Sequence, residues 1–196
     1  DLEAAVNMDE ALAVRGGPIY GDDNLFAEID LIKGDPEGAF AAADRVFEGT
    51  YESGVQEHVY LEPQSLAALV EDGKLTIYAS TQCPFYIRHS VAAALGVPEE
   101  EVRVKHTVTG GGFGGKEHYP DVIAVPIAVA TLKIGRPVQL VLSREEDMAF
   151  TSKRHPSRIK IRSALDKDGS LLGMEIDRMI DGGEYESYSM VVLQGA

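Results

Sequence analysis

The sequence has little cysteine, little positive charge and no long apolar run, and each shortage excludes a class of protein. The single Cys83 excludes an internal disulfide and any iron–sulfur cluster ligated by this chain alone, so redox partners must lie elsewhere. Lys and Arg number 18 against 32 Asp and Glu, and the net charge of −14 argues against nucleic acid or an anionic membrane as a partner. The longest apolar run, residues 122–130, contains a proline and is too short to span a bilayer.

The histidines and the N-terminal residues argue against a zinc site and against a secretion signal. None of the five histidines is paired at metal-ligand spacing, so a zinc site is not indicated. The first residues, Asp1, Leu2 and Glu3, do not resemble a secretion signal, which predicts a cytoplasmic protein. Because the chain starts without Met, we expect it to be part of a longer protein. With 196 residues, 44% of them hydrophobic, it can bury the core of one domain or of two small ones.

The pattern of apolar residues and turns predicts an α+β fold with mixed sheets, β-hairpins and flanking helices. Residues 1–35 contain glycine and proline breaks and are interpreted as an extended lead-in segment, followed by one domain over residues 36–196. Helices are expected over residues 36–44, 84–95 and 119–133. Strands are expected over residues 45–51, 65–71, 74–80, 99–107, 137–142, 158–165 and 171–180, with hairpins formed by 65–80 and 158–180 and with 137–142 buried.

A glycine-rich run at residues 109–117 is the most informative segment. Its sequence, TGGGFGGKE, places five glycines around Phe113, between an expected strand and an expected helix. Glycine tolerates positive φ and has no Cβ, so consecutive backbone N–H groups can point into one concavity and contact a ligand. The ligand of such a loop is expected to be anionic or rich in oxygen.

Two other interpretations compete with a cofactor-binding or ligand-binding loop. Residues 110–116 satisfy the phosphate-loop pattern GxxxxGK, but Glu117 stands where a nucleotide loop needs a Ser or Thr for Mg²⁺, and its charge would repel phosphates. A flexible linker fits poorly, because linkers favour serine and lack a Phe-Gly-Gly-Lys-Glu core between regular elements. A nucleotide- or phosphate-binding module remains the alternative from another functional class.

The glycine run belongs to a series of motifs that resembles the large molybdenum-binding subunit of the xanthine dehydrogenase and aldehyde oxidase family. The motifs follow the family's order from about Gly34 onward. They are QEHVYLEP at 56–63, STQ at 80–82, GGGFGGKE at 110–117, GRPV at 135–138, SREEDM at 143–148 and RHP at 154–156.

The resemblance implies a molybdopterin cofactor, either as the pterin itself or as its cytosine dinucleotide. In the family no protein side chain ligates the molybdenum, so the protein binds the cofactor through hydrogen bonds to its ligands. Gln82 matches the glutamine that donates to the apical oxo ligand. The loop backbone that packs against the same ligand and the dithiolene matches Gly111, Gly112, Phe113 and Gly114. Iron–sulfur clusters and FAD are expected on partner domains or subunits.

Glu117 matches the position at which purine-hydroxylating members bind the heterocycle with a glutamate. A hydrogen-bonded carboxylic acid can recognise ring N–H and C=O groups. Equally, a carboxylate here could cap the helix that follows. Cys83 lies beside Gln82 but is assigned no catalytic role.

Other charged residues are expected to be structural. Residues 56–58 and Glu62 are expected to fix loops by hydrogen bonds, and Arg144 is expected to pair with Asp147. Lys116 is expected to be solvated or in a salt bridge.

The implied activity is the oxidative hydroxylation of an N-heterocycle, as in purine metabolism, or of an aldehyde, with oxygen from water. The family's general base lies far towards the C-terminus, so it is expected beyond Ala196 and the chain alone is expected to be inactive. An ungapped alignment places Gly195 where xanthine-oxidising members have a substrate-binding arginine, which argues against xanthine itself. A non-catalytic scaffold that has lost the cofactor is a third alternative.

Overall fold

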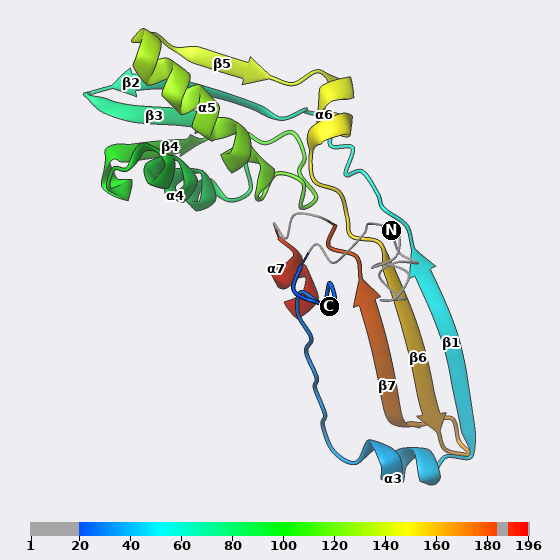
Figure 1. The fold of residues 1–196 in the computed structure, drawn as a ribbon. Coiled ribbons are helices and arrows are strands. Elements are labelled where there is room, and N and C mark those ends of the chain that lie inside the picture. The colour runs from blue at the N-terminus through cyan, green and yellow to red at the C-terminus, as the bar shows by residue number, and fades with distance from the viewer. Residues whose placement is uncertain (1–19, 184–187, 196) are drawn as a thin grey trace. The chain divides into compact units, whose positions relative to one another are not determined.

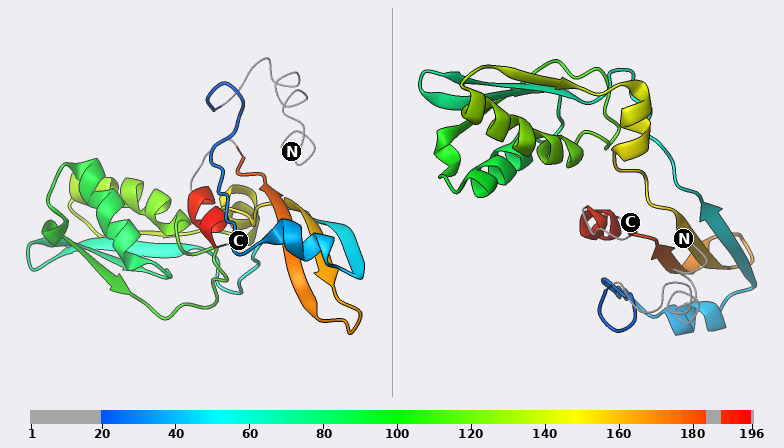
Figure 2. Two further views of the ribbon diagram at one scale, coloured as in Figure 1. Left: turned by 90° about the horizontal axis from the view of Figure 1, so that it is seen from below. Right: turned by 45° about the horizontal axis from the view of Figure 1, so that its top comes forward.

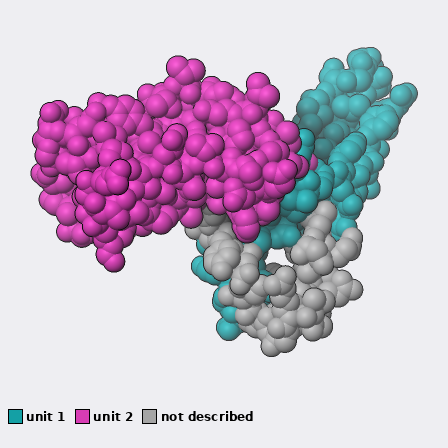
Figure 3. All heavy atoms as spheres, turned by 90° about the horizontal axis from the view of Figure 1, so that it is seen from above, with its two compact units in different colours: residues 1–56, 155–196 teal, residues 57–154 magenta. Residues whose placement is uncertain are grey.

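The computed structural model describes residues 20–183 and 188–195 and confirms the α+β class. The chain divides into two compact units (Figure 3). Unit 1 contains residues 1–56 and 155–196, and unit 2 contains residues 57–154. Most of the expected lead-in, residues 1–19, lies outside the described residues, while residues 20–35 form a turn followed by chain without helix or strand. The assignment of residues 36–196 to one domain stays a prediction.

Unit 2 is built on a four-stranded sheet with the strand order β4-β3-β2-β5. Strands β2 (Ser65–Glu71) and β3 (Lys74–Ala79) form the expected antiparallel hairpin. Its turn residues Asp72 and Gly73 have φ angles of 50° and 76°, the positive values that a tight hairpin turn requires. Strand β4 (Val102–His106) runs parallel to β3 and follows a short 3-10 helix, η1 (Glu99–Glu101), where the sequence predicted a strand.

Two helices cover one face of this sheet, α4 (Pro84–Leu95) and α5 (Tyr119–Ile134) (Figures 1 and 2). Each begins with proline in its first turn and ends at a glycine in the left-handed conformation, Gly96 or Gly135. The core of unit 2 lies between the helices and the sheet. Its fully buried members include Ala68, Ile77, Ile87, Val91, Ala124 and Ala128.

Unit 1 contains a three-stranded antiparallel sheet with the order β1-β6-β7. The strands are β1 (Arg45–Ser53), β6 (Ser157–Leu165) and β7 (Leu171–Ile180). Helix α3 (Pro36–Ala41) contacts β7 and ends three residues earlier than predicted, and α7 (Ser189–Gln194) lies near the C-terminus. The hairpin of β6 and β7 was predicted, but the pairing of β1 with β6 joins segments more than 100 residues apart.

Two other expectations need correction. Strand β5 (Val138–Val141) was predicted to be buried, but it is the edge strand of its sheet and Val141 is 57% exposed. Helix α6 (Arg144–Phe150) was not predicted as a helix, although the spacing of Ser143 and Glu146 is that of a capping box, which the structure contains. Among the described residues, no helix combines the length and hydropathy needed to cross a bilayer.

Candidate functional site

The glycine-rich loop connects β4 to α5 in unit 2, as the sequence predicted. Three of its residues, Gly111, Phe113 and Gly114, have positive φ angles of 95°, 53° and 93°. The side chain of Phe113 is 75% exposed. A non-glycine residue in the left-handed region is strained, and such strain concentrates at functional sites.

Gly110, Gly112 and Gly115 lie too close to neighbouring side chains of the protein to carry a Cβ. A Cβ on Gly110 would lie 2.6 Å from Cβ of Glu62, and one on Gly115 would lie 2.7 Å from Cε1 of Tyr60. A Cβ on Gly112 would overlap the carboxamide of Gln82. The sequence interpretation, in which the glycines serve close approach to a ligand, therefore accounts for only part of the glycine content.

The middle of the loop, residues 111–113, has backbone N–H groups that are free to donate. Within the described part of the chain, the N–H groups of Gly111, Gly112 and Phe113 form no hydrogen bond. The flanking N–H groups are used internally: Gly110 donates to Glu62, and Gly115 donates to the carbonyl of Gly112 at 2.8 Å. Three consecutive backbone donors are therefore available to oxygen or sulfur acceptors.

Gln82 is attached to this loop by three hydrogen bonds. Its backbone N–H donates to the carbonyl of Lys116 at 2.7 Å, and its Oε1 accepts from the N–H groups of Gly114 at 3.0 Å and Lys116 at 3.2 Å. Because backbone N–H groups can only donate, the orientation of the Gln82 carboxamide is fixed, and its Nε2 remains as a donor without a partner among the described residues. The structure thus brings together Gln82 and the loop residues that the sequence singled out.

Glu117 follows directly and is half-buried. Its carboxylate forms no hydrogen bond or ion pair in the described ranges, and its Oε1 lies 4.0 Å from the position of a Cβ on Gly114. Helix α5 has His118 as its N-cap residue and no side-chain capping bond, so the structure does not support the capping role considered for Glu117. Burial, together with the nearby charge of Glu117, raises the pKa of the Cys83 thiol.

Lys116 differs most from its expected environment. It was expected to be solvated or in a salt bridge; it is paired, but it is also fully buried, and its Nζ lies 2.9 Å from Oε2 of Glu62. Desolvation alone would raise the pKa of Glu62, but hydrogen bonds from Ser80, from the N–H of Gly110 and from Lys116 together lower it to about 2. The expectation that Glu62 fixes a loop by hydrogen bonds is confirmed.

A second network of buried hydrogen bonds connects helix α6 to the glycine loop. Tyr60 donates to Asp147 at 2.8 Å and accepts from Nε2 of Gln64, which also donates to the carbonyl of Gly115 at 2.8 Å. The predicted pair of Arg144 and Asp147 is present at 3.2 Å. Burial, and then the hydrogen bond to Asp147, raises the pKa of Tyr60. Tyr60 and Gln64 were not predicted as site residues, although Tyr60 lies in the motif at 56–63 and Gln64 directly follows it.

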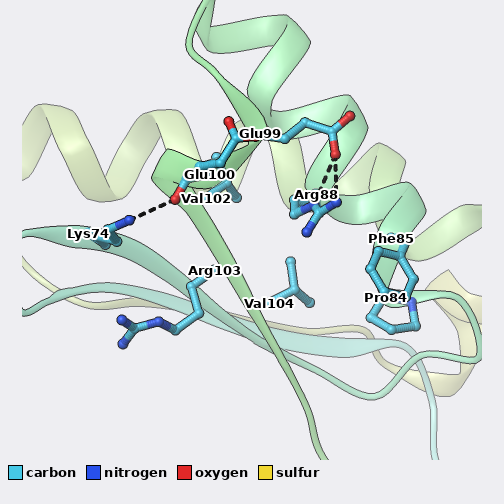
Figure 4. A pocket seen from close by; sticks show the side chains of 9 residues that line it. All are labelled: Lys74, Pro84, Phe85, Arg88, Glu99, Glu100, Val102, Arg103 and Val104. Carbon is cyan, nitrogen blue, oxygen red and sulfur yellow. Dashed lines mark hydrogen bonds and ion pairs between the residues drawn. The ribbon is translucent and has the colours of Figure 1, made fainter.

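A pocket of about 300 Å³ lies elsewhere in unit 2, beside β4, η1 and α4 (Figure 4). None of the expected site residues lines it. Its charges are largely paired, since Arg88 binds Glu99 at 2.9 Å and Lys74 donates to the carbonyl of Glu100 at 2.9 Å. The glycine loop is therefore the candidate functional site. In the described ranges, no group of His, Cys, Asp and Glu side chains could hold a metal ion directly.

Comparisons with known proteins show the family of the chain. The family model of the molybdopterin cofactor-binding domain matches residues 20–196. Along its whole length the chain is 36% identical to the nicotinate dehydrogenase large molybdopterin subunit of Eubacterium barkeri, of which it covers 46%. It is 35% identical to xanthine dehydrogenase/oxidase of Rattus norvegicus over 100% of this chain and 14% of the relative. The aldehyde oxidoreductase of Desulfovibrio gigas superposes with a TM-score of 0.73 at 30% identity, over 83% of this chain and 18% of that one.

The chain belongs to the molybdopterin cofactor-binding domain family, and its relatives are molybdopterin oxidoreductases. The resemblance inferred from the sequence motifs is confirmed, as is the fold class. The chain spans less than half the length of these relatives.

Proposed function

We propose that this chain forms one face of the cofactor site of a molybdenum hydroxylase. The observation that carries the proposal is the set of neutral donors at the site, namely Nε2 of Gln82 and the N–H groups of Gly111, Gly112 and Phe113. All four are without partners in the described structure, and they belong to elements held together by hydrogen bonds.

These residues fit molybdopterin. Neutral donors suit oxo and dithiolene ligands whose charge changes when the metal is reduced. Gln82 and the loop backbone would hold the cofactor, in its plain or cytosine dinucleotide form, and Phe113 would lie beside it. The bound cofactor supplies the transfer of a water-derived oxygen and the uptake of two electrons. Iron–sulfur and FAD partners would receive these electrons.

Glu117 supports a heterocyclic substrate. Its carboxylate lies beside the loop at Gly114 and has no internal partner in the described chain, so it is available to a ligand. We propose that it hydrogen-bonds a purine-like N-heterocycle, with an aldehyde as the second substrate class. The general base would lie in a part of the protein outside this chain. A place in purine metabolism and a cytoplasmic location stay predictions.

Metal and cofactor analysis of the full-length protein that contains this chain tests the proposal. Stoichiometric molybdenum with a pterin would support it. Bound nucleotide without molybdenum would favour the phosphate-binding alternative at residues 110–116. Absence of both from a correctly folded protein would favour a non-catalytic scaffold.

A further inference from the structure

Both ends of the glycine loop meet on one carboxylate oxygen. Oε2 of Glu62 accepts from the N–H of Gly110 at 2.7 Å, from Nζ of Lys116 at 2.9 Å and from Oγ of Ser80 at 2.6 Å. The backbone N–H of Glu62 also donates to the carbonyl of Gly110 at 3.1 Å. Glu62 therefore bridges the first and last residues of the segment 110–116.

The side chain of Lys116 is buried, and its ammonium group contacts Glu62, Ser80 and the ring of Tyr60. Its side chain is 0% exposed, its Nζ donates to Oγ of Ser80 at 3.1 Å, and it lies 4.7 Å from the ring centroid of Tyr60. Its carbonyl accepts from Oγ1 of Thr81 at 3.1 Å as well as from the N–H of Gln82. A buried ammonium group is strongly unfavourable without its counter-ion, so Glu62 and Lys116 depend on one another.

We propose that Glu62 and Lys116 are positioning residues that form a clasp across the base of the loop. The clasp holds residues 110–116 in the conformation that presents the three unpaired N–H groups before any ligand arrives. A flexible glycine segment would otherwise lose conformational entropy on binding, and ordering it in advance strengthens binding. The inference rests on the proposed function only for the identity of the ligand.

The test uses the full-length protein and four variants. Lys116→Met removes the ammonium group, Glu62→Gln removes the carboxylate charge with little change of shape, and the double variant removes both charges. Lys105→Met is the control for the partners of the lysine: Lys105 also pairs with a glutamate, Glu71 at 2.8 Å, and lies 4.8 Å from a tyrosine ring, but it is 41% exposed and lies outside the glycine loop.

Two readouts are needed, with far-UV circular dichroism to establish folding. The first is hydrogen exchange of peptides covering residues 110–116 in protein stripped of cofactor. The second is the rate at which molybdenum is lost from loaded protein during dialysis. Lys116→Met and Glu62→Gln should each accelerate both by about tenfold or more, the effect of losing one charge-assisted hydrogen bond. Lys105→Met should change neither.

The double variant distinguishes loss of the ordering contact from the cost of leaving one buried charge unpaired. If the clasp orders the loop, exchange stays fast when both charges are gone; restoration of slow exchange would overturn the inference. Wild-type exchange in both single variants would overturn it too. If Glu62→Gln does not fold because Lys116 is left buried without its counter-ion, Lys116→Met supplies the same comparison. A wild-type protein without molybdenum and pterin would contradict the proposed function, and the exchange measurement would still decide the clasp.

Discussion

Replacing Gly112 with alanine should release Gln82 from the glycine loop. A Cβ on Gly112 would lie 2.8 Å from Cδ and 3.1 Å from Cγ of Gln82, so the carboxamide must rotate away. The N–H groups of Gly114 and Lys116 then lose their acceptor. At about 1 kcal/mol for each hydrogen bond, the free energy of unfolding should fall by about 2 kcal/mol. Gly112 does not have a positive φ, so backbone strain adds nothing to this value.

The control for this variant is Gly135→Ala. Gly135 ends α5 with a φ of 64° and has nothing within 4 Å of a Cβ, so alanine there costs roughly 1 to 2 kcal/mol of backbone strain without touching the loop. Urea denaturation of the 196-residue chain should show similar losses for both variants. Only Gly112→Ala should accelerate hydrogen exchange at residues 114 and 116 and lower the molybdenum content of the full-length protein. Wild-type exchange and molybdenum content in Gly112→Ala would refute the reasoning.

Three further predictions concern the substrate, the acid stability and the chain alone. Glu117→Ala should lower kcat/KM for an N-heterocycle by about ten- to a hundredfold and spare a simple aldehyde, whereas Gln82→Ala should slow both; equal losses for Glu117→Ala would contradict its recognition role. Because the pKa of Glu62 falls from its ordinary 4.5 to about 2 on folding, its stabilisation should be complete above pH 5 and disappear as the pH falls towards 2. The denaturation midpoints of wild type and Glu62→Gln should therefore converge in acid, and a constant difference down to pH 2 would contradict this. The 196-residue chain should fold without retaining molybdenum, and stoichiometric metal in it would show that one face of the site suffices.

Proline in the first turn and glycine at the end made α4 and α5 predictable, and a turn sequence did the same for the hairpin of β2 and β3. Helix α4 has the bounds that were predicted, because Pro84 fits the first turn and Gly96 adopts a φ of 67° that ends the helix. The turn at Asp72 and Gly73 fixed the hairpin in the same way. In each case a few neighbouring residues determine the conformation.

Features that depend on distant partners could not be predicted. The apolar residues of β5 resemble those of a buried strand, and only the strand order shows that β5 lies at an edge. Likewise, β1 pairs with β6 through partners such as Glu52 and Arg158, which are 106 residues apart. The capping box of Ser143 and Glu146, in contrast, is a local signal of where α6 begins.

The site shows the same division between local and distant causes. The glycine-rich loop is contained in nine consecutive residues, so the sequence alone located it. The burial of Lys116 follows from a carboxylate 54 residues away, and without Glu62 the same lysine would be expected at the surface. A sequence pattern can therefore locate a loop at which a ligand is expected, while the side chains that hold this loop in place become visible only when the fold brings them together.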